Sequence, residues 1–351
     1  MKQYDVIVIG GGPAGLFAAG FAARHGGRVL LLEKNRQCGA KVLITGTGRC
    51  NVTYDEQDPR KFAEHFGRNG RALLTALYAF GVAETVEFFA DHGVPLKVER
   101  GGRIFPESGR AEDVQKALVD FARNEGVEIR TGCEVKGLLV DELRVLEVET
   151  SAGHFSADNF ILATGGLSYP ETGCTGDGYL WAKDCGHHLV NPEPALMPVK
   201  LKERWTSEVS RFNLKNVRIT LCVDGKKIDE RFGEAFFTRS GIGGPIVLDL
   251  GSRVRDALKQ GKVKLLLDFK PAVAKELFDK RLQRELAEHS NLDFANALGQ
   301  LLPRDMIPIF VRLAGIDPAK KCHSVTRAER QRLLKLFKEM ELDVTGCEGF
   351  R

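Results

Sequence analysis

The first 33 residues restrict the fold more than any other part of the chain. An apolar run over residues 4–9 leads directly into GGGPAG at residues 10–15, and a helical segment then extends to about Gly26. A second apolar run over residues 28–32 ends on Glu33. A strand, a glycine turn, a helix and a second strand therefore follow one another without a break. This order predicts the βαβ unit with which a doubly wound parallel sheet begins.

The glycine turn and the acid after the second strand predict a site for the ADP half of a dinucleotide. Gly10 permits the tight turn, Gly12 has no side chain to block a pyrophosphate, and Gly15 lets the helix approach the strand. The N-terminus of the helix offers free N–H groups to phosphates, and Glu33 is spaced to accept hydrogen bonds from ribose hydroxyls. A purely structural βαβ turn is the alternative. The predicted ADP-binding residues are Gly10, Gly12, Pro13, Ala14, Gly15 and Glu33.

Composition narrows the classes of partner. The 351 residues, 43% hydrophobic and 28% charged, are typical of a globular protein of two or three domains. A net charge of +4 is too small for this length to indicate binding to nucleic acid, and no apolar run approaches the length of a membrane span. The eight cysteines form no C-x-x-C pair and no metal-binding spacing. We therefore expect a cytoplasmic protein with reduced thiols and a small-molecule substrate, without metal, nucleic acid or membrane as partners. The pattern indicates no particular oligomeric state.

The remainder of the chain changes character along its length. Residues 34–58 have little periodicity, whereas residues 71–92 have helical spacing and residues 94–106 suggest a hairpin. From residue 191 to about 271 the signals are mostly those of strands, which indicates a small antiparallel sheet or barrel. Residues 272–340 have helical patterns broken by prolines. The strands expected after residue 191 are 197–201, 217–223, 234–238, 246–250 and 263–269.

Several further stretches resemble one family of flavoproteins. They are GAK at residues 39–41, TGTGRCN at 45–51, ATGG at 163–166, SYPETG at 168–173, TGDG at 175–178, and the Gly-rich phrase between 233 and 245. In these stretches the chain resembles the HI0933-like family of FAD-binding proteins, also called the BaiN or aminoacetone-oxidase-like group. The resemblance extends over nearly the whole chain, and Gly-Arg-Cys-Asn is its most specific part. It implies FAD as the cofactor.

The resemblance and the periodicity together predict an α/β architecture of three parts. A Rossmann-like FAD/NAD(P)-binding domain is expected over residues 1–190, completed by about 325–351. An inserted β-rich, barrel-like domain is expected over residues 191–271, and a small helical domain over residues 272–324. Proteins of this family usually continue past the segment that matches residues 347–350, with a segment that closes over the flavin. Because this chain stops at Arg351, we expect an incomplete flavin half of the site and weak or absent binding of FAD.

The loop over residues 45–51 is expected beside the isoalloxazine ring. Gly46 and Gly48 would allow close approach of the backbone, and Arg49 would pair with a phosphate or an anionic substrate. An ordinary glycine-rich surface loop is the alternative. For Cys50, a buried structural thiol is favoured over a redox role. The expected cofactor contacts in this loop are Thr45, Gly46, Gly48, Arg49, Cys50 and Asn51.

Other cofactor contacts are expected around the sheet. Lys34 and Lys41 are expected near the cofactor, with solvated lysines as the alternative, and Val135 is expected near the adenine. Gly165-Gly166 ends a strand and suits a second backbone contact, with a plain turn as the alternative. For Asp177, a helix cap is favoured over a contact with the ribityl chain. The contacts expected here are Lys34, Lys41, Val135, Ala163, Thr164, Gly165, Gly166 and Asp177.

No catalytic constellation of Ser/His/Asp or paired carboxylates can be identified. A flavin enzyme requires none, because the flavin carries the hydride chemistry while the protein binds and orients. Tyr169, Thr172, Arg239 and Ser240 are candidates for the substrate side, with plain structural use as the alternative. The candidates for catalysis are Arg49, Tyr169 and Arg239.

The resemblance implies an FAD-dependent oxidoreductase. A hydride is expected to pass through the flavin from NAD(P)H or a small organic substrate to an acceptor, either oxygen or an enone-type C=C bond. No second G-x-G-x-x-G with a strand and an acid is present, which argues against a separate NAD(P)H-binding domain. One alternative is a flavin-binding redox sensor or assembly module without turnover. Another is a tRNA-modifying flavoprotein, against which the modest charge argues.

Overall fold

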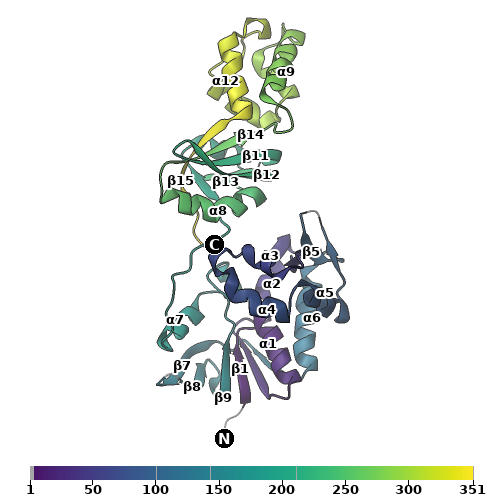
Figure 1. Cartoon of the computed structure of the whole chain (residues 1–351), viewed down its shortest axis with the longest axis vertical. Coiled ribbons are helices and arrows are strands. Elements are labelled where there is room, and N and C mark those ends of the chain that lie inside the picture. The colour runs from purple at the N-terminus through teal and green to yellow at the C-terminus, as the bar shows by residue number, and fades with distance from the viewer. Residues whose placement is uncertain (1–3, 100, 143, 211, 351) are drawn as a thin grey trace. The chain divides into compact units, whose positions relative to one another are not determined.

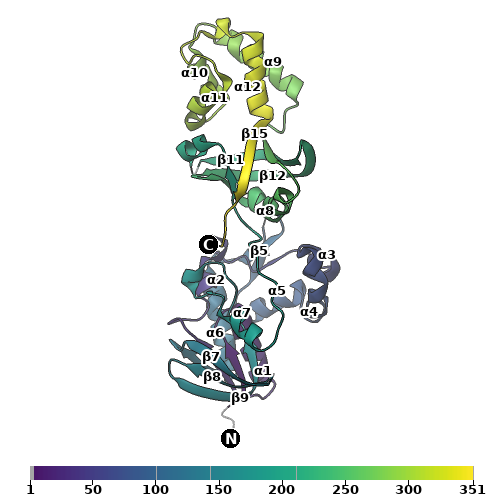
Figure 2. The same ribbon diagram turned by 90° about the vertical axis from the view of Figure 1, so that its left-hand side faces the viewer.

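The structure of the chain is a computed structural model that describes residues 4–99, 101–142, 144–210 and 212–350. Arg351, at the end of the predicted FAD-binding segment, and residues 1–3, at its start, lie outside the described residues. The described chain divides into two units, one up to Asn191 and one from Pro192 to Phe350 (Figures 1 and 2). Each unit has its own hydrophobic core. The sequence predicts that the insertion begins at residue 191, next to this boundary.

Unit 1 is built on a six-stranded sheet in the order β6-β2-β1-β9-β8-β7. β1 lies between β2 and β9 and runs parallel to both, and β6 extends the parallel part beyond β2. β7 and β8 continue antiparallel from the first half of β9. The helix α1 connects β1 to β2, so the predicted βαβ start is confirmed. These elements are β1 (Tyr4–Ile9), α1 (Pro13–Arg24), β2 (Val29–Glu33), β6 (Glu128–Thr131), β7 (Val135–Asp141), β8 (Arg144–Thr150) and β9 (Gly153–Leu162).

Both faces of the parallel strands are covered, which explains why β1 and β2 are almost wholly apolar. One face packs against α1 and α6 (Ala111–Asn124). These two helices lie so close that a Cβ atom on Gly20 would approach the Phe121 ring to 2.3 Å. The other face packs against Val148 and Phe155 from the antiparallel strands. The parallel part of the sheet is therefore buried on both faces.

Most of the remaining elements of unit 1 lie in the connection between β2 and α6, and α7 follows β9. A small sheet in the order β3-β5-β4 contains the predicted hairpin, with Leu96 paired to Pro106. The predicted helical stretch 71–92 is two helices, and a short helix, α2, lies in the stretch where little periodicity was seen. The elements are α2 (Ala40–Ile44), β3 (Thr53–Tyr54), α3 (Pro59–Glu64), α4 (Leu74–Ala79), α5 (Val82–Asp91), β4 (Leu96–Val98), β5 (Arg103–Pro106) and α7 (Asp177–Asp184).

Among the described residues, no single helix has both the length and the apolar character needed to cross a membrane. One bent pair, Asn69–Ala79 with Val82–Asp91, meets these requirements by length and composition when taken together, with a bend of 47°.

Unit 2 contains a closed barrel in the order β10-β13-β12-β11-β14-β15, together with helices. The barrel confirms the expected β-rich insertion, and the helices after β14 confirm the helical pattern. Its core is formed by alternate residues of the strands, such as Ile219 and Leu221 on β11 and Leu265 and Leu267 on β14. The elements are β10 (Val199–Leu201), β11 (Asn213–Val223), β12 (Lys226–Thr238), β13 (Gly241–Gly243), α8 (Pro245–Leu258), β14 (Val263–Asp268), α9 (Lys275–Glu288), α10 (Phe294–Ala297), α11 (Ile307–Ala314), α12 (Arg327–Lys338) and β15 (Met340–Cys347).

The end of the chain differs from the prediction. Residues 325–351 were expected to rejoin the nucleotide-binding domain, but α12 and β15 belong to unit 2. β15 pairs antiparallel with β10 and β14 and closes the barrel. Met340 and Leu342 alternate with polar residues and point into the barrel core, which gives the segment a strand pattern that helix-based interpretation missed.

The predicted strand 246–250 is wrong, because these residues form the first turns of α8. Gly244 with φ +100° precedes the helix and Pro245 occupies its first position, where a missing N–H is harmless. Ile246, Val247 and Leu250 fall on one helical face and are buried in the barrel core. A short apolar run fits both periods, so the run alone could not decide.

Candidate cofactor site

A cavity of about 300 Å³ opens at the carboxyl ends of β1, β2 and β9 in unit 1. This edge of an open α/β sheet is where such folds bind ligands. Residues from both sides of the glycine turn, from the strand ends and from α7 line the cavity. The predicted residues that line it are Gly10, Gly12, Pro13, Ala14, Glu33, Lys34, Lys41, Val135, Ala163, Thr164, Gly165 and Asp177.

The three glycines of the turn have different surroundings. Gly10 has φ +108°, a conformation that L side chains rarely adopt. A Cβ atom on Gly15 would lie 1.9 Å from the carbonyl oxygen of Gly10, so Gly15 permits the packing of helix on strand and does not line the cavity. A Cβ atom on Gly12 would meet nothing within 4 Å, and Gly12 precedes the first turn of α1. The open space at Gly12 fits a pyrophosphate at the helix N-terminus.

The carboxylate of Glu33 is held by the backbone of the turn. Its Oε2 accepts a hydrogen bond of 2.7 Å from the N–H of Gly11, and its Oε1 accepts one of 2.7 Å from the N–H of Asn35. The residue is 7% exposed and borders the cavity. Glu33 therefore fixes the glycine turn against the end of β2. A contact with ribose hydroxyls stays a prediction.

Lys34 and Asp177 join the strand end to α7 across the cavity. Lys34 Nζ lies 3.0 Å from Asp177 Oδ2 and donates at 2.7 Å to Thr175 Oγ1. Burial raises the pKa of Asp177, but the hydrogen bonds from Thr175 and Lys34 outweigh it and the pKa is lowered. The preferred interpretation of Asp177 as a helix cap is wrong, since α7 begins at Asp177 with Gly176 as its cap.

The loop over residues 45–51 is compact and does not line the cavity. Gly46, Thr47, Gly48 and Cys50 all have positive φ values between 54° and 79°. For a β-branched residue such as Thr47 this conformation is strained, and it persists only where the surroundings enforce it. The N–H of Cys50 donates to the carbonyl of Thr45 at 3.0 Å, which closes the loop on itself. Burial raises the pKa of the Cys50 thiol, as expected for a structural cysteine.

Arg49 is engaged by the β4–β5 hairpin. Its guanidinium pairs with Glu99 and lies 4.2 Å from the centre of the Phe105 ring. The Asn51 amide, in the orientation that satisfies its neighbours, donates to the carbonyl oxygens of Ile104 and Thr53. These two predicted cofactor residues therefore attach the loop to the hairpin. The structure gives the Arg49 side chain this docking role and does not bring it into the cavity.

The remaining candidates are dispersed. Lys41 Nζ donates at 2.6 Å to the carbonyl of Ser168, and Gly166 does not line the cavity. Tyr169 is 48% exposed, at a turn with φ +55°. Arg239 lies on an exposed turn of unit 2, between β12 and β13. Among the residues that the structure describes, no group of three or more His, Cys, Asp or Glu side chains is arranged to hold a metal ion.

Several lining residues were not among the predicted cofactor contacts. Cys133 lies in the turn between β6 and β7, two positions before Val135, and lines the cavity with it. Trp181 follows Asp177 by four positions and therefore shares its helix face. Thr172 had been considered only for the substrate. The missed lining residues are Ile9, Leu32, Asn35, Gly39, Ala40, Cys133, Thr172, Gly173, Cys174 and Trp181.

The parallel sheet, the glycine turn and the cavity at its carboxyl edge define unit 1 as a Rossmann-like FAD-binding domain, the class found in flavoprotein oxidoreductases. The family model described as "HI0933-like protein Rossmann domain" matches residues 4–337. The chain belongs to this HI0933-like family of FAD-dependent oxidoreductases, and the resemblance seen in the sequence is confirmed.

Curated relatives match almost the whole chain. It is 30% identical over 346 residues to the 3-dehydro-bile acid delta(4,6)-reductase of Clostridium scindens, covering 98% of this chain and 83% of the relative. It is 26% identical over 351 residues to the ribosomal RNA dihydrouridine synthase of Escherichia coli K12, covering 100% and 84%. A solved structure, 3-ketosteroid-delta4-(5alpha)-dehydrogenase from Rhodococcus jostii RHA1 in complex with 4-androstene-3,17-dione, has 18% identity and a TM-score of 0.49, covering 92% and 80%.

Proposed function

We propose that this protein is an FAD-dependent reductase of a C=C bond conjugated to a carbonyl group. The observation that carries the proposal is the chemistry shared by the two curated relatives that match nearly the whole chain. One is named as a reductase of a 3-dehydro steroid acid with double bonds at positions 4 and 6. The other is named for forming dihydrouridine, whose parent uracil ring has a double bond conjugated to a carbonyl. A saturated carbonyl compound is the common product.

The residues of unit 1 have defined tasks in this proposal. Gly12 and the N-terminus of α1 receive the pyrophosphate, Glu33 holds the turn in shape, and Lys34 borders the same cavity. When bound, FAD supplies hydride transfer between a donor and an acceptor carbon. The hydrogen bonds to Glu33 and the ion pair between Lys34 and Asp177 hold these groups in place before the cofactor binds.

The proposed net reaction balances with NAD(P)H as the reductant. One hydride equivalent from NAD(P)H reaches the β-carbon of the conjugated C=C bond, and one H⁺ taken up from the solvent reaches the α-carbon. The products are NAD(P)⁺ and the saturated carbonyl compound. Since a second dinucleotide fingerprint is missing from the sequence, the nicotinamide is proposed to reach the flavin site directly.

An anaerobic reduction experiment tests the proposal. FAD-loaded full-length protein is mixed with NADH or NADPH, and loss of visible flavin absorbance is followed. The reduced protein is then mixed separately with a 4-ene-3-ketone steroid, a uridine-containing RNA oligomer and oxygen. Return of the flavin absorbance with the steroid or the RNA supports the proposal. Return with oxygen alone indicates an oxidase, and no return with any acceptor indicates a non-enzymatic flavin module.

A further inference from the structure

Residues 165–176, which we call the strap, lie between β9 and α7 and form one wall of the cofactor cavity. The facing wall is formed by residues that follow β2 and by residues of α2. The strap residues that line the cavity are Gly165, Thr172, Gly173 and Cys174.

The strap has no anchor in the cores of unit 1. Residues 165–175 are all described, and none of them is buried. The backbone hydrogen bonds of this stretch join its own residues, as at 2.9 Å from the N–H of Thr172 to the carbonyl of Tyr169, and none joins it to another described part of the chain. A segment with few buried contacts and no backbone pairing opens at a low cost in free energy.

The first attachment of the strap is a polar cluster at its C-terminal end. Lys34 Nζ donates at 2.7 Å to Thr175 Oγ1, which in turn donates at 2.7 Å to Asp177 Oδ2. The Lys34 ammonium also lies 3.0 Å from this carboxylate. The side chains of Lys34 and Asp177 are 26% and 40% exposed. Because an ion pair this open to solvent contributes little stability, the attachment can be released.

Two further side chains hold the strap from the facing wall. Asn35 Nδ2 donates at 3.1 Å to the carbonyl oxygen of Thr172. Lys41 Nζ donates at 2.6 Å to the carbonyl oxygen of Ser168. Asn35 and Lys41 also line the cavity, as Lys34 does. The side-chain bonds that fix the strap therefore join the two walls of the cofactor cavity.

The two ends of the strap have backbone conformations that suit a hinge. Gly165 has φ +76° and Gly176 has φ +86°, in a region that L side chains rarely adopt. The cavity of about 300 Å³ is at the lower limit of the volumes of pockets that hold drug-sized ligands. A dinucleotide is larger than such a ligand. The cavity must therefore widen when a dinucleotide enters, and the strap is the wall that is free to move.

We propose that the strap is a hinged gate through which FAD enters and leaves unit 1, with Lys34 and Thr175 as its latch. The latch closes the strap both with and without FAD, so opening precedes association as well as dissociation. A weaker latch then raises both rates by the same factor and leaves the dissociation constant unchanged. This inference concerns exchange of the cofactor and goes beyond the proposed reductase reaction.

The variant Thr175→Val tests the latch, because it removes the hydroxyl group and nearly keeps the shape of the side chain. Thr175 does not line the cavity, so no contact with the cofactor is deleted. Stopped-flow mixing of FAD with the full-length protein, followed by flavin fluorescence, measures association, and dilution of the loaded protein measures dissociation. Both rates are expected to rise about fivefold, with the dissociation constant within about twofold of the wild-type value.

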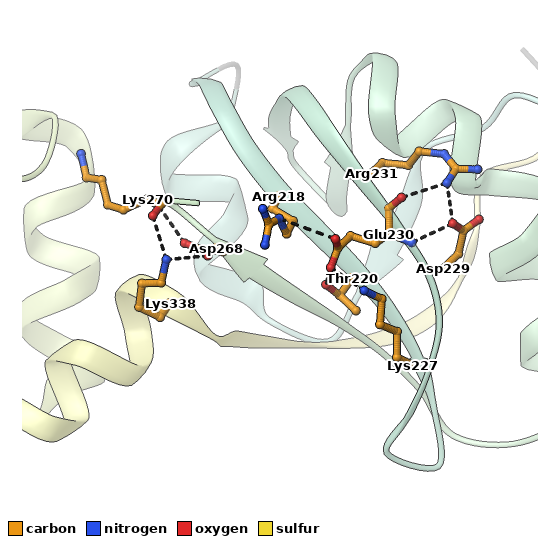
Figure 3. Close-up of polar contacts among 9 residues, drawn as sticks. All are labelled: Arg218, Thr220, Lys227, Asp229, Glu230, Arg231, Asp268, Lys270 and Lys338. Atoms are coloured by element: carbon orange, nitrogen blue, oxygen red, sulfur yellow. Dashed lines mark hydrogen bonds and ion pairs between the residues drawn. The ribbon is translucent and has the colours of Figure 1, made fainter. Parts of the chain in front are cut away.

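Two control variants accompany this measurement. Thr175→Ser keeps the hydroxyl group and should restore the wild-type rates. Thr220→Val in unit 2 removes a hydroxyl group that donates to Glu230 Oε2 at 3.0 Å (Figure 3), and it should leave both rates unchanged. A faster dissociation of Thr175→Val with unchanged association would overturn the gate, because the latch would then act on the bound state alone. Unchanged rates, or no uptake of FAD by the wild type, would also overturn it.

Hydrogen exchange tests the latch without the cofactor. The strap amides of Thr175→Val should exchange faster than those of the wild type, whereas β1 and α1 should keep their protection. Equal exchange of the strap in both proteins would overturn the latch. Failure of enones to reoxidise the reduced flavin, with both rates raised in Thr175→Val, would remove the proposed reductase and leave the gate. Reoxidation by an enone, with unchanged rates in Thr175→Val, would remove the gate and leave the reductase.

Discussion

Gly10, Gly12 and Gly15 show how one residue type serves three purposes within six positions. Gly10 supplies a positive φ, Gly15 allows contact with the carbonyl of Gly10, and Gly12 leaves space that the protein does not fill. The first two requirements belong to folding. A side chain at Gly12 would touch no protein atom within 4 Å, and we propose that this open space, which borders the cavity, serves the ligand.

The Gly12→Ala variant is therefore expected to separate folding from cofactor binding. Unfolding free energy without FAD should change by no more than about 1 kcal/mol, since only a helix-cap preference is altered. Affinity for FAD should fall at least about tenfold, or about 1.4 kcal/mol, because the methyl group occupies the pyrophosphate position. Flavin fluorescence titration and thermal melting measure the two quantities.

The matched control is Gly137→Ala on β7, where a Cβ atom also meets nothing within 4 Å but the residue does not line the cavity. This variant should keep both stability and FAD affinity. Equal affinities for FAD in Gly12→Ala and wild type would place the pyrophosphate elsewhere.

At the residue scale, site residues were predicted best where they belong to one short motif of neighbouring positions. Four of the five predicted turn residues and Glu33 border one cavity as their spacing indicated, whereas Gly15 lies outside it. Arg49 was misjudged because its partners, Glu99 and Phe105, lie about 50 positions away and no local pattern announces them. A charged residue in a glycine-rich loop looks the same whether a phosphate or a distant hairpin neutralises it.

At the scale of elements, the junction between α12 and β14 depends on one buried ion pair. Lys338 and Asp268 have side chains 8% and 14% exposed. Figure 3 shows Lys338 directed into this junction, where its ammonium meets Asp268 and the carbonyl of Lys270. Desolvated ions that are paired and hydrogen-bonded become costly when one partner is removed.

The Lys338→Met variant is accordingly expected to lower the unfolding free energy of unit 2 by about 3–5 kcal/mol, because Asp268 is left buried without a partner. Lys335→Met on the same helix is the control: Lys335 and Glu341 are 59% and 40% exposed, so its loss should cost no more than about 1 kcal/mol. Denaturant unfolding followed by circular dichroism compares the two. Similar losses of unfolding free energy in both variants would contradict the claim that the buried ion pair stabilises unit 2 more than the exposed one.

The start of α12 predicts a dependence of stability on acid. The ammonium of Lys320, with the N–H of Thr326, lowers the pKa of Glu329 to about 2. Since the unfolded-state pKa of a glutamate is about 4.3, the native state binds the proton less tightly. The stabilisation is fully present above about pH 4.3 and is lost as pH falls towards 2.

Unit 2 should therefore lose stability between about pH 4.3 and 2, and Glu329→Gln should reduce the steepness of that loss while lowering stability at neutral pH. Glu276→Gln, an exposed carboxylate on α9, should leave the profile unchanged. Denaturant midpoints measured across this pH range provide the test. If the midpoint of Glu329→Gln falls with pH as steeply as that of the wild type, the prediction is refuted.

Helices and strands were likewise predicted best where the signal is contained in a local stretch of sequence. Helices with sustained periodicity and the 94–106 hairpin were found from sequence. Residues 246–250 were not, because five apolar-rich positions cannot distinguish a strand from the buried face of a helix. The short helix α2 was not predicted, because five residues are too few to establish a helical periodicity.

At the scale of the whole molecule, two units with separate cores predict two unfolding events. Scanning calorimetry should resolve two transitions, and FAD should raise only the transition of unit 1. At a free FAD concentration about 100 times the dissociation constant, the unfolding free energy of unit 1 should rise by about 2.7 kcal/mol. At the same FAD concentration, Gly12→Ala should reduce this stabilisation to about 1.4 kcal/mol or less, because its affinity is at least about tenfold weaker. A single transition, or equal shifts in both, would mean that the units unfold as one.

The whole-molecule plan was predicted as a nucleotide-binding domain with a β-rich and helical insertion, and the sequence identified each part. The prediction that residues 325–351 belong to the nucleotide-binding domain was wrong. The barrel closes through the pairing of β15 with β10 and β14, which lie far from it in the sequence. No pattern within β15 states that β10 and β14 are its neighbours. Such non-local pairing is encoded by the complementarity of whole surfaces.

The closure of the barrel by β15 has a consequence during synthesis. About 70 residues separate β14 from β15, so at about 5–20 residues per second the ribosome needs about 4–14 s to deliver the missing strand. During that interval β10 and β14 present unpaired edges to the solvent or to a sister nascent chain. The helices α9 to α12, translated in the meantime, thus set the length of the period in which unit 2 is most vulnerable to misassembly.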